Sequence, residues 1–313
     1  MVTDYPVAVF WPSIKILELE RGKTVITNIL QAIFNGILTG GVYAVVSVGL
    51  SLVFGIVDVV NFAQPEFLMM GMFVAYFLSV ATGLDPTLAS PLVFLVVFCF
   101  GALVQKYLVQ RVLDAPLVVQ IFLTVAIGMV MVSGAQLLFG ADFRSAPTSY
   151  TTMAVHLGPF QFNVPQILAF FGAAILASLL WVFMEWTDLG RSIRATAQNR
   201  TAAVLVGINP YRMYILAFAL GTGLAGAAGA MILPYSYVFP TIGHDWGLIM
   251  FTVVVLGGLG SVPGAMLAGL IIGVIQSLTS VFFPTQLQNL FVFVVFILVL
   301  AYRPAGLLGD KSS

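Results

Sequence analysis

A polar stretch, Asp58 to Glu66 (DVVNFAQPE), lies between two long apolar runs of the chain. An acidic side chain near the centre of a bilayer costs at least about 2.5 to 3.5 kcal/mol on insertion scales, so burial requires a partner or an aqueous path. The alternative is an ordinary turn at an aqueous surface, in which Asp58 and Glu66 are solvated.

Other residues that could do chemistry are scattered along the chain. His156 and His244 are isolated from each other and from paired carboxylates at metal-ligand spacing, which favours surface histidines over a metal or catalytic site. A phosphate-binding P-loop requires Gly-x4-Gly-Lys-Ser/Thr, and the Gly-Lys-Thr that begins at Gly22 has Leu17 in place of the first glycine. We therefore predict no catalytic residue, metal site or cofactor in this chain, so any ATP must be bound by partner subunits.

The composition is that of a protein solvated by lipid. Sixty per cent of the 313 residues are hydrophobic, only 8% are charged, and the mean hydropathy is +1.08. Soluble domains carry about 25% charged residues, and a water-soluble fold cannot hide so much apolar surface. The formal net charge is zero, so the composition implies no nucleic-acid partner. We predict an integral membrane protein.

The apolar runs predict helices rather than a barrel. A helix needs about 20 residues to cross a hydrocarbon core of about 30 Å, whereas spanning β-strands would alternate in polarity. The runs do not alternate, so we predict an all-α, polytopic bundle of about 8 to 9 transmembrane helices. Full spans are predicted at 25–55, 66–82, 91–109, 116–140, 164–186, 212–233, 264–283 and 286–302.

A glycine-rich segment predicts an interrupted helix near 247–264. Residues 247–257 are apolar but too short for a full crossing, and Gly257, Gly258, Gly260 and Pro263 follow closely. Inside a membrane, such an interruption is tolerated only against protein or a water-filled path. We expect a broken helix, a half helix or a short ninth span here.

The distribution of basic residues predicts the topology. Lysine and arginine in short loops mark the cytoplasmic side. The loop 187–211 contains three arginines, and Lys106 and Arg111 lie two spans earlier, on the same side. We expect both clusters to face the cytoplasm and the loops 141–163 and 234–246 to face outward.

Counting membrane crossings from these loops also predicts on which side of the membrane the two ends of the chain lie. We divide the chain into an amino-terminal tail, 1–24, a transmembrane domain, 25–303, and a carboxyl-terminal tail, 304–313. If 247–257 crosses the membrane fully, the carboxyl-terminal tail is cytoplasmic and the amino terminus lies outside.

The cytoplasmic loop 187–211 could also bind a partner. Arg191 to Val206 is free of glycine and proline, and Gly207 and Asn209-Pro210 then stop the run, which suits a short surface helix. One interpretation is a docking site for an ATPase, and the other is a basic loop that serves only topology.

Taken together, several motifs resemble the permease subunits of branched-chain amino acid ABC importers, a family that includes permeases for urea and other small solutes. The resemblance extends from about Asn28 to Gly309. The motifs that carry it are Asn35-Gly36, GVYAVVSVGLSLVFG from Gly41, Asn61-Phe62-Ala63, Gly71, LGRSIRATAQN from Leu189, AAVLVGIN from Ala202, LAGAAG from Leu224, VVLGGLGSVPGAMLAG from Val254 and RPAGLLG from Arg303.

The resemblance implies an assembly in the plasma (inner) membrane of a bacterium or archaeon. Its expected partners are a second, related but heterologous permease subunit, two cytoplasmic ATPase subunits and an extracytoplasmic solute-binding protein. Residues 201–207 are similar to the family's coupling motif, Glu-Ala-Ala-x3-Gly, with Thr201 in place of the glutamate. The residues predicted to couple to the ATPase are Arg194, Thr201, Ala202, Ala203 and Gly207.

The resemblance also implies a function and a path. We expect import of branched-chain or other amino acids, or of a small polar solute such as urea, by alternating access, with no covalent bond broken by this subunit. Family members commonly read Asn-Phe-Ala-His-Gly-Glu at 61–66, where this chain has Gln64 and Pro65 in place of His and Gly. The predicted path residues are Asn35, Asn61, Gln64, Glu66, Gly257, Gly258 and Gly260.

The alternative function is a self-contained secondary transporter or channel for a small solute, which would have similar spans and a similar broken helix. Such proteins more often place a charged coupling residue in mid-span. The middles of the later predicted helices contain none.

Overall fold

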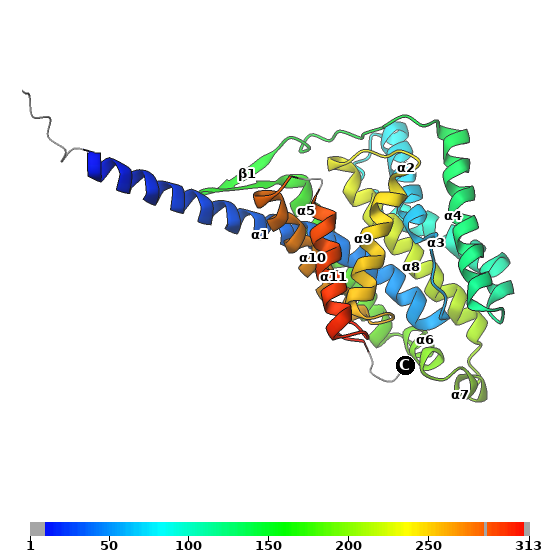
Figure 1. Ribbon diagram of the computed structural model, residues 1–313. Coiled ribbons are helices and arrows are strands. Elements are labelled where there is room, and N and C mark those ends of the chain that lie inside the picture. Colours follow the sequence, from blue (N-terminus) through cyan, green and yellow to red (C-terminus); the bar gives the residue numbers. More distant parts are fainter. Residues whose placement is uncertain (1–9, 285–286, 310–313) are drawn as a thin grey trace, which may run out of the picture.

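The computed structural model describes residues 10–284 and 287–309, with the backbone alone for residues 10–24. Predictions made for residues 1–9, Gln286 and residues 310–313 lie outside the described residues. The described chain is a helix bundle with one small hairpin (Figure 1). Its elements are α1 (Phe10–Val57), α2 (Gln64–Thr82), α3 (Ser90–Tyr107), α4 (Leu117–Phe139), β1 (Ala154–Leu157), β2 (Phe160–Asn163), α5 (Val164–Trp186), α6 (Asp188–Gln198), α7 (Arg200–Leu205), α8 (Pro210–Ile232), α9 (Ile242–Gly257), α10 (Val262–Phe282) and α11 (Gln288–Tyr302), with short 3-10 turns at Val109–Val112 and Leu233–Tyr235.

The prediction of a polytopic all-α membrane protein is confirmed. Seven helices in the described residues are long and apolar enough to cross a membrane, and α9 and α11 are shorter apolar helices. The run 286–302, expected as a full span, forms the 15-residue α11. The expected interruption near 247–264 is present, but α9 begins earlier than expected, at Ile242. Asp245 lies in its first turn, where an acidic side chain interacts favourably with the helix dipole.

Two helices form the centre of the bundle. α8 is buried along almost its whole length, and most of the apolar part of α1 is buried as well. Glycines allow α1 to approach its neighbours closely, because a Cβ atom on Gly40 would lie 2.8 Å from the carbonyl oxygen of Gly269 in α10. Close backbone contact through small residues is typical of packing between membrane helices. α1 extends back to Phe10, so residue 24, the expected end of a tail, lies within a helix.

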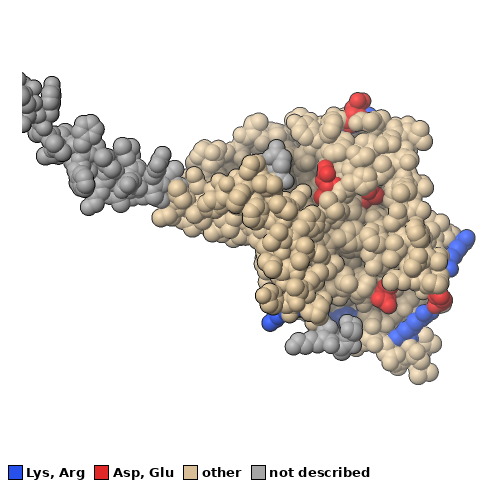
Figure 2. All heavy atoms as spheres, in the orientation of Figure 1, with Lys and Arg blue, Asp and Glu red and all other residues tan. Residues whose placement is uncertain are grey.

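The loops gather at two opposite faces. The segments between α4 and β1 and between α8 and α9 lie at the upper face in Figure 1. They are joined there by Arg144, which pairs with Val238 through two backbone hydrogen bonds, and Tyr150 of the first segment donates a hydrogen bond of 2.7 Å to Asp85. At the lower face lie α6, α7 and the end of α11, and the blue lysine and arginine atoms in Figure 2 lie mostly in this half of the view. Because Arg200 forms an ion pair with Asp114 there, the two basic loops share one face, as expected.

The loop 141–163 contains a hairpin that the sequence analysis did not predict. β1 and β2 pair antiparallel, from Ala154 opposite Asn163 to Leu157 opposite Phe160. The hairpin lies along α1 (Figure 1), where the Phe34 ring contacts Phe160 at a centroid distance of 5.4 Å. Two four-residue strands are too short for an alternation of polarity to distinguish them from a loop.

Candidate functional site

The polar stretch between α1 and α2 is largely buried. α1 ends at Val57, and Asp58 adopts a left-handed conformation with φ = 56° that turns the chain. Asp58 is exposed, whereas Asn61 and Gln64 are 0% exposed and Glu66 is 4% exposed. The solvated-turn interpretation therefore holds for Asp58 but not for Glu66.

Asn61 and Gln64 hold this interruption together through their side-chain amides. Asn61 Nδ2 donates to Gln64 Oε1 at 2.9 Å, and Asn61 Oδ1 accepts from the backbone N–H of Ala63 at 3.1 Å. Gln64 Nε2 then donates to the carbonyl oxygen of Gly221 in α8 at 2.9 Å. Each amide thereby has hydrogen-bond partners inside the bundle, which buried polar groups require. They tie the start of α2 to the central helix.

Glu66 differs from these two neighbours. Its Oε2 is buried and has no hydrogen-bond partner in the part of the chain that the structure describes. The carboxylate lies against Gly243 of α9, where a Cβ atom would come within 2.6 Å of Oε1, and the side-chain stem lies near Gly128 of α4, where a Cβ atom would lie 3.5 Å from Cγ. A carboxylate within a span is costly and is usually retained for a function.

The other predicted path residues lie elsewhere. Asn35 accepts a hydrogen bond from Gln31 at 3.0 Å, and the 22 residues of helix from there to Val57 extend about 33 Å. Gly257, Gly258 and Gly260 form the turn between α9 and α10. The structure thus brings Asn61, Gln64 and Glu66 together and separates them from Asn35.

The glycine turn is closed by the end of the chain. The backbone N–H of Leu307 donates to Leu256 O at 2.8 Å, and that of Leu308 donates to Gly257 O at 3.0 Å. Gly258 and Gly260 have φ angles of 105° and 81°, which favour glycine. This segment is a tightly packed backbone junction at the lower face.

A cavity of about 640 Å³ lies beside this junction, among α1, α5, α6 and α10. Its lining is mainly apolar and includes Gly55, Trp181 and Met266. Arg194 and Glu185 contribute its charged side chains and form an ion pair with each other. Arg194, predicted to couple to an ATPase, therefore lines a cavity within this chain.

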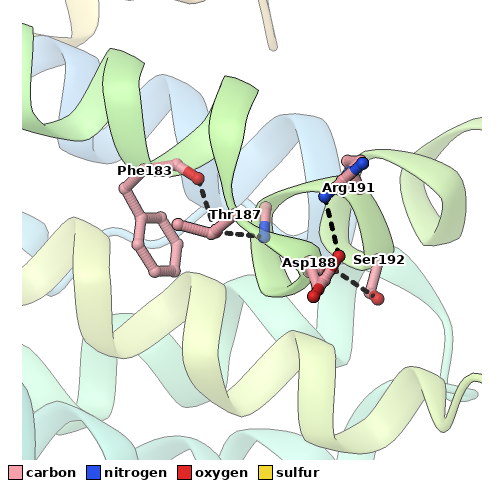
Figure 3. Close-up of polar contacts among 6 residues, drawn as sticks. Phe183, Thr187, Asp188, Arg191 and Ser192 are labelled. Atoms are coloured by element: carbon pink, nitrogen blue, oxygen red, sulfur yellow. Dashed lines mark hydrogen bonds and ion pairs between the residues drawn. The ribbon is translucent and has the colours of Figure 1, made fainter.

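The corner between α5 and α6 is fixed by local hydrogen bonds (Figure 3). Thr187 Oγ1 donates to Phe183 O at 2.6 Å and accepts from the backbone N–H of Gly190 at 3.0 Å, which caps α6. Asp188 accepts from Arg191 at 2.7 Å, and its carbonyl oxygen accepts from Ser192 at 2.8 Å. These contacts set the angle at which α6 leaves the bundle.

The run expected to form one short helix forms two. Asn199 ends α6 and caps α7, since its Oδ1 accepts from the backbone N–H of Ala202 at 2.9 Å. An asparagine at this position competes with the continuing helix for backbone donors. The prediction of an unbroken helix was wrong because it considered only glycine and proline as helix breakers.

α7 ends in an exposed apolar tip, which we define as Val204, Leu205 and Val206. Their exposed fractions are 54%, 83% and 76%. Ala203 is buried, and Gly207 adopts φ = 86°. Ala203 and Gly207 were predicted coupling residues and the tip was not, although three adjacent branched apolar residues in a loop outside the predicted spans were a signal for it.

Arg200 connects α7 to the bundle. It pairs with Asp114 at 3.3 Å, donates to the hydroxyl of Tyr211 at 3.0 Å and lies 5.2 Å from the centre of that ring. Arg200, Asp58 and Tyr214 also line a cavity of about 330 Å³. The first residue of α7 and the end of α1 therefore face the same space.

The upper face has its own polar cluster. Tyr150 donates to Asp85 and contacts Thr87 Oγ1 at 2.9 Å. Burial raises the pKa of Tyr150 above its ordinary value, so its hydroxyl remains a donor at neutral pH. These contacts join the loop after α2 to the loop before the hairpin.

Comparison with known proteins extends over most of the chain. The family described as branched-chain amino acid transport system / permease component matches residues 32–300. The chain is 29% identical over 293 residues to the high-affinity branched-chain amino acid transport system permease protein LivH of Escherichia coli (strain K12), covering 90% of this chain and 95% of the relative. It is 31% identical over 300 residues to the corresponding permease protein BraD of Pseudomonas aeruginosa, covering 91% and 97%. The probable LivH of Methanocaldococcus jannaschii is 24% identical, with 95% and 96% covered. No solved structure matches.

Proposed function

This chain belongs to the family of permease components of branched-chain amino acid transport systems, and from that premise we propose that the solute it translocates is a branched-chain amino acid. The chain is a multi-pass permease subunit of an ATP-binding cassette importer. The observation that carries the choice of solute is the similarity over nine-tenths of the chain to relatives named for branched-chain amino acids. A similar small polar solute is the nearest alternative.

The assembly that we propose contains a second, related permease subunit, two cytoplasmic ATPase subunits and an extracytoplasmic solute-binding protein. It resides in the plasma membrane of a bacterium or archaeon. ATP is bound by the partner subunits, and this chain performs no covalent chemistry. The apolar tip of α7 supports an ATPase partner, because three adjacent apolar side chains exposed on a charged aqueous face gain stability when a partner covers them.

The proposed mechanism is alternating access driven by ATP. Closure of the ATPases displaces α6 and α7, and Arg200 transmits the displacement to Asp114 and to the start of α8. Asp58 faces the same cavity, so a shift of Arg200 changes the electrostatic field at the end of α1. ATP biases the equilibrium only to the extent that it favours one bundle conformation over the other.

Reconstitution tests this proposal. The tagged chain is purified from its host with the proteins that accompany it, and ATP-driven uptake of labelled leucine is measured in proteoliposomes. The proposal expects a copurifying P-loop ATPase and uptake that depends on ATP. Uptake driven by an ion gradient in the absence of any ATPase would instead support the secondary-transporter alternative.

The docking surface has a separate test. Leu205→Asp places a charge at the most exposed residue of the tip and should abolish copurification of the ATPase. Leu157→Asp is the matched control, since Leu157 is also exposed, at 62%, but lies on the hairpin at the opposite face. Equal recovery of the ATPase with both variants would contradict the assignment of the tip.

A further inference from the structure

Glu66 is the polar residue of the α1–α2 junction whose binding capacity is unused. The amides of Asn61 and Gln64 are engaged with each other, with Ala63 and with Gly221. The Oε2 atom of Glu66 is buried in the same region without a partner among the described residues, and no ion pair to this carboxylate is present there. A buried acceptor left unpaired is destabilising, and a native structure that retains one commonly uses it for function.

The carboxylate is enclosed in this structure, and two glycines from other helices lie next to its side chain. Gly128 in α4 lies next to its Cγ atom and Gly243 in the first turn of α9 lies next to its carboxylate, and neither glycine has a side chain of its own there. The N-cap residue of α9, Thr241, makes no side-chain capping bond, so the positive end of this 16-residue helix dipole lies beside the carboxylate and compensates part of its charge. Movement of that turn would uncover Glu66 and remove this compensation.

We propose that the carboxylate of Glu66 binds the ammonium group of the transported amino acid when the first turn of α9 moves away. This inference rests on the proposed function and names the chemistry of its site. An ammonium group brings a positive charge and three donors to a carboxylate, which only accepts. An uncharged solute such as urea offers donors but leaves the buried charge uncompensated, so the site favours ammonium compounds over neutral ones.

The test uses the complete transporter in proteoliposomes with its loaded binding protein. Glu66→Gln keeps the shape of the side chain and removes its charge, and Glu66→Asp keeps the charge. Asp245→Asn is the matched control, because Asp245 is an exposed carboxylate in the same turn of α9. ATP-driven uptake of labelled L-leucine and ATP hydrolysis stimulated by the loaded binding protein are measured together.

For Glu66→Gln we expect leucine uptake to fall at least about tenfold while stimulated ATP hydrolysis stays within about twofold, because the cycle continues without its solute contact. Glu66→Asp should retain more uptake than Glu66→Gln, and Asp245→Asn should match the unsubstituted transporter. Unchanged uptake by Glu66→Gln would overturn the inference. Loss of both uptake and stimulated hydrolysis would overturn it too, since that result assigns Glu66 to assembly.

The same experiment separates this inference from the proposed function. If the unsubstituted transporter and Glu66→Gln take up leucine equally well, the proposed function stands and only the inference about Glu66 is overturned. Uptake of urea but not of leucine by the unsubstituted transporter would overturn both.

Discussion

Different groups stabilise two junctions of the bundle, one between α1 and α2 and the other between α9 and α10. At the first, the side chains of Asn61 and Gln64 bind backbone groups of the turn and of α8. At the second, backbone bonds from Leu307 and Leu308 close a turn built on glycines. Both arrangements give buried polar groups a hydrogen-bond partner, which is required where water is absent.

The difference shows what each junction can do. The backbone junction is closed mainly by backbone hydrogen bonds, and its polar side chain, Ser261, is engaged in capping α10. The side-chain junction keeps a polar environment inside the bundle, where the carboxylate of Glu66 lies without a partner among the described residues. This difference is why we place the proposed solute contact at the first junction.

The largest effect is expected at the backbone junction. Gly258→Ala places a side chain at φ = 105°, where a Cβ atom would lie 2.6 Å from Gly309 Cα. We expect a loss of about 3 kcal/mol or more, measured as a lower midpoint of thermal unfolding in detergent. Gly134→Ala is the control, since a Cβ atom added at Gly134 in α4 would have no neighbouring atom within 4 Å outside its own helix backbone. Similar midpoints for the two variants would show that the junction is not tightly packed.

The side-chain junction should respond less strongly. Gln64→Leu leaves Gly221 O and the amide of Asn61 without this partner, with an expected loss of about 2 kcal/mol in the same unfolding measurement. Gln136→Leu in α4 is the control, because that glutamine is exposed. A double-mutant cycle with Asn61→Ala should give a coupling energy of at least about 0.5 kcal/mol. Strict additivity would mean that the two amides act independently.

A smaller effect is expected where a side chain contributes to the second junction. Ser261 caps α10, because its Oγ accepts from the backbone N–H of Gly264 at 3.2 Å. Ser261→Ala should lower the free energy of unfolding by about 1 kcal/mol. Ser178→Ala provides the comparison, since this exposed serine only donates to the carbonyl oxygen of Ala174 within its own helix. A larger loss for Ser261→Ala than for Gln64→Leu would reverse the contrast between the junctions.

The smallest effect on stability is expected at an exposed ion pair in α6, outside both junctions. The ion pair between Arg191 and Asp188 has side chains that are 62% and 95% exposed. Arg191→Ala should change the free energy of unfolding by less than about 1 kcal/mol, because water and salt screen the pair. The measurement is the same thermal unfolding, repeated at high salt, where the difference should shrink further. A loss as large as that of Gln64→Leu would show that α6 depends on this pair.

Local chemistry made much of the fold predictable. Apolar runs of about 20 residues specify helices in lipid wherever they occur, and glycine with proline marks the turn after α9, so both were found from the sequence. The division of 191–206 was missed because Asn199 acts as a cap, a role that depends on where the helix before it ends. The hairpin was missed because its position depends on Phe34, more than a hundred residues earlier.

The candidate site was only half predictable. The residue types in 58–66 identified a polar segment, but its sequence fitted a solvated turn and a buried junction equally well. Gly221, Gly128 and Gly243, which surround Gln64 and Glu66, come from three other helices. No local pattern links these residues.

The sequence by itself therefore determined the membrane class, the approximate spans, the polar stretch after the first span, the helix interruption near 247–264 and the family, because each follows from hydrophobicity, backbone hydrogen bonding or a contiguous motif. Only the tertiary structure decided that Asp58 is solvated while Glu66 is buried, that Arg194 faces a cavity and that the apolar tip of α7 is exposed. The physical reason is that burial is a property of how distant helices pack, and the same residue types are stable on either side of that boundary.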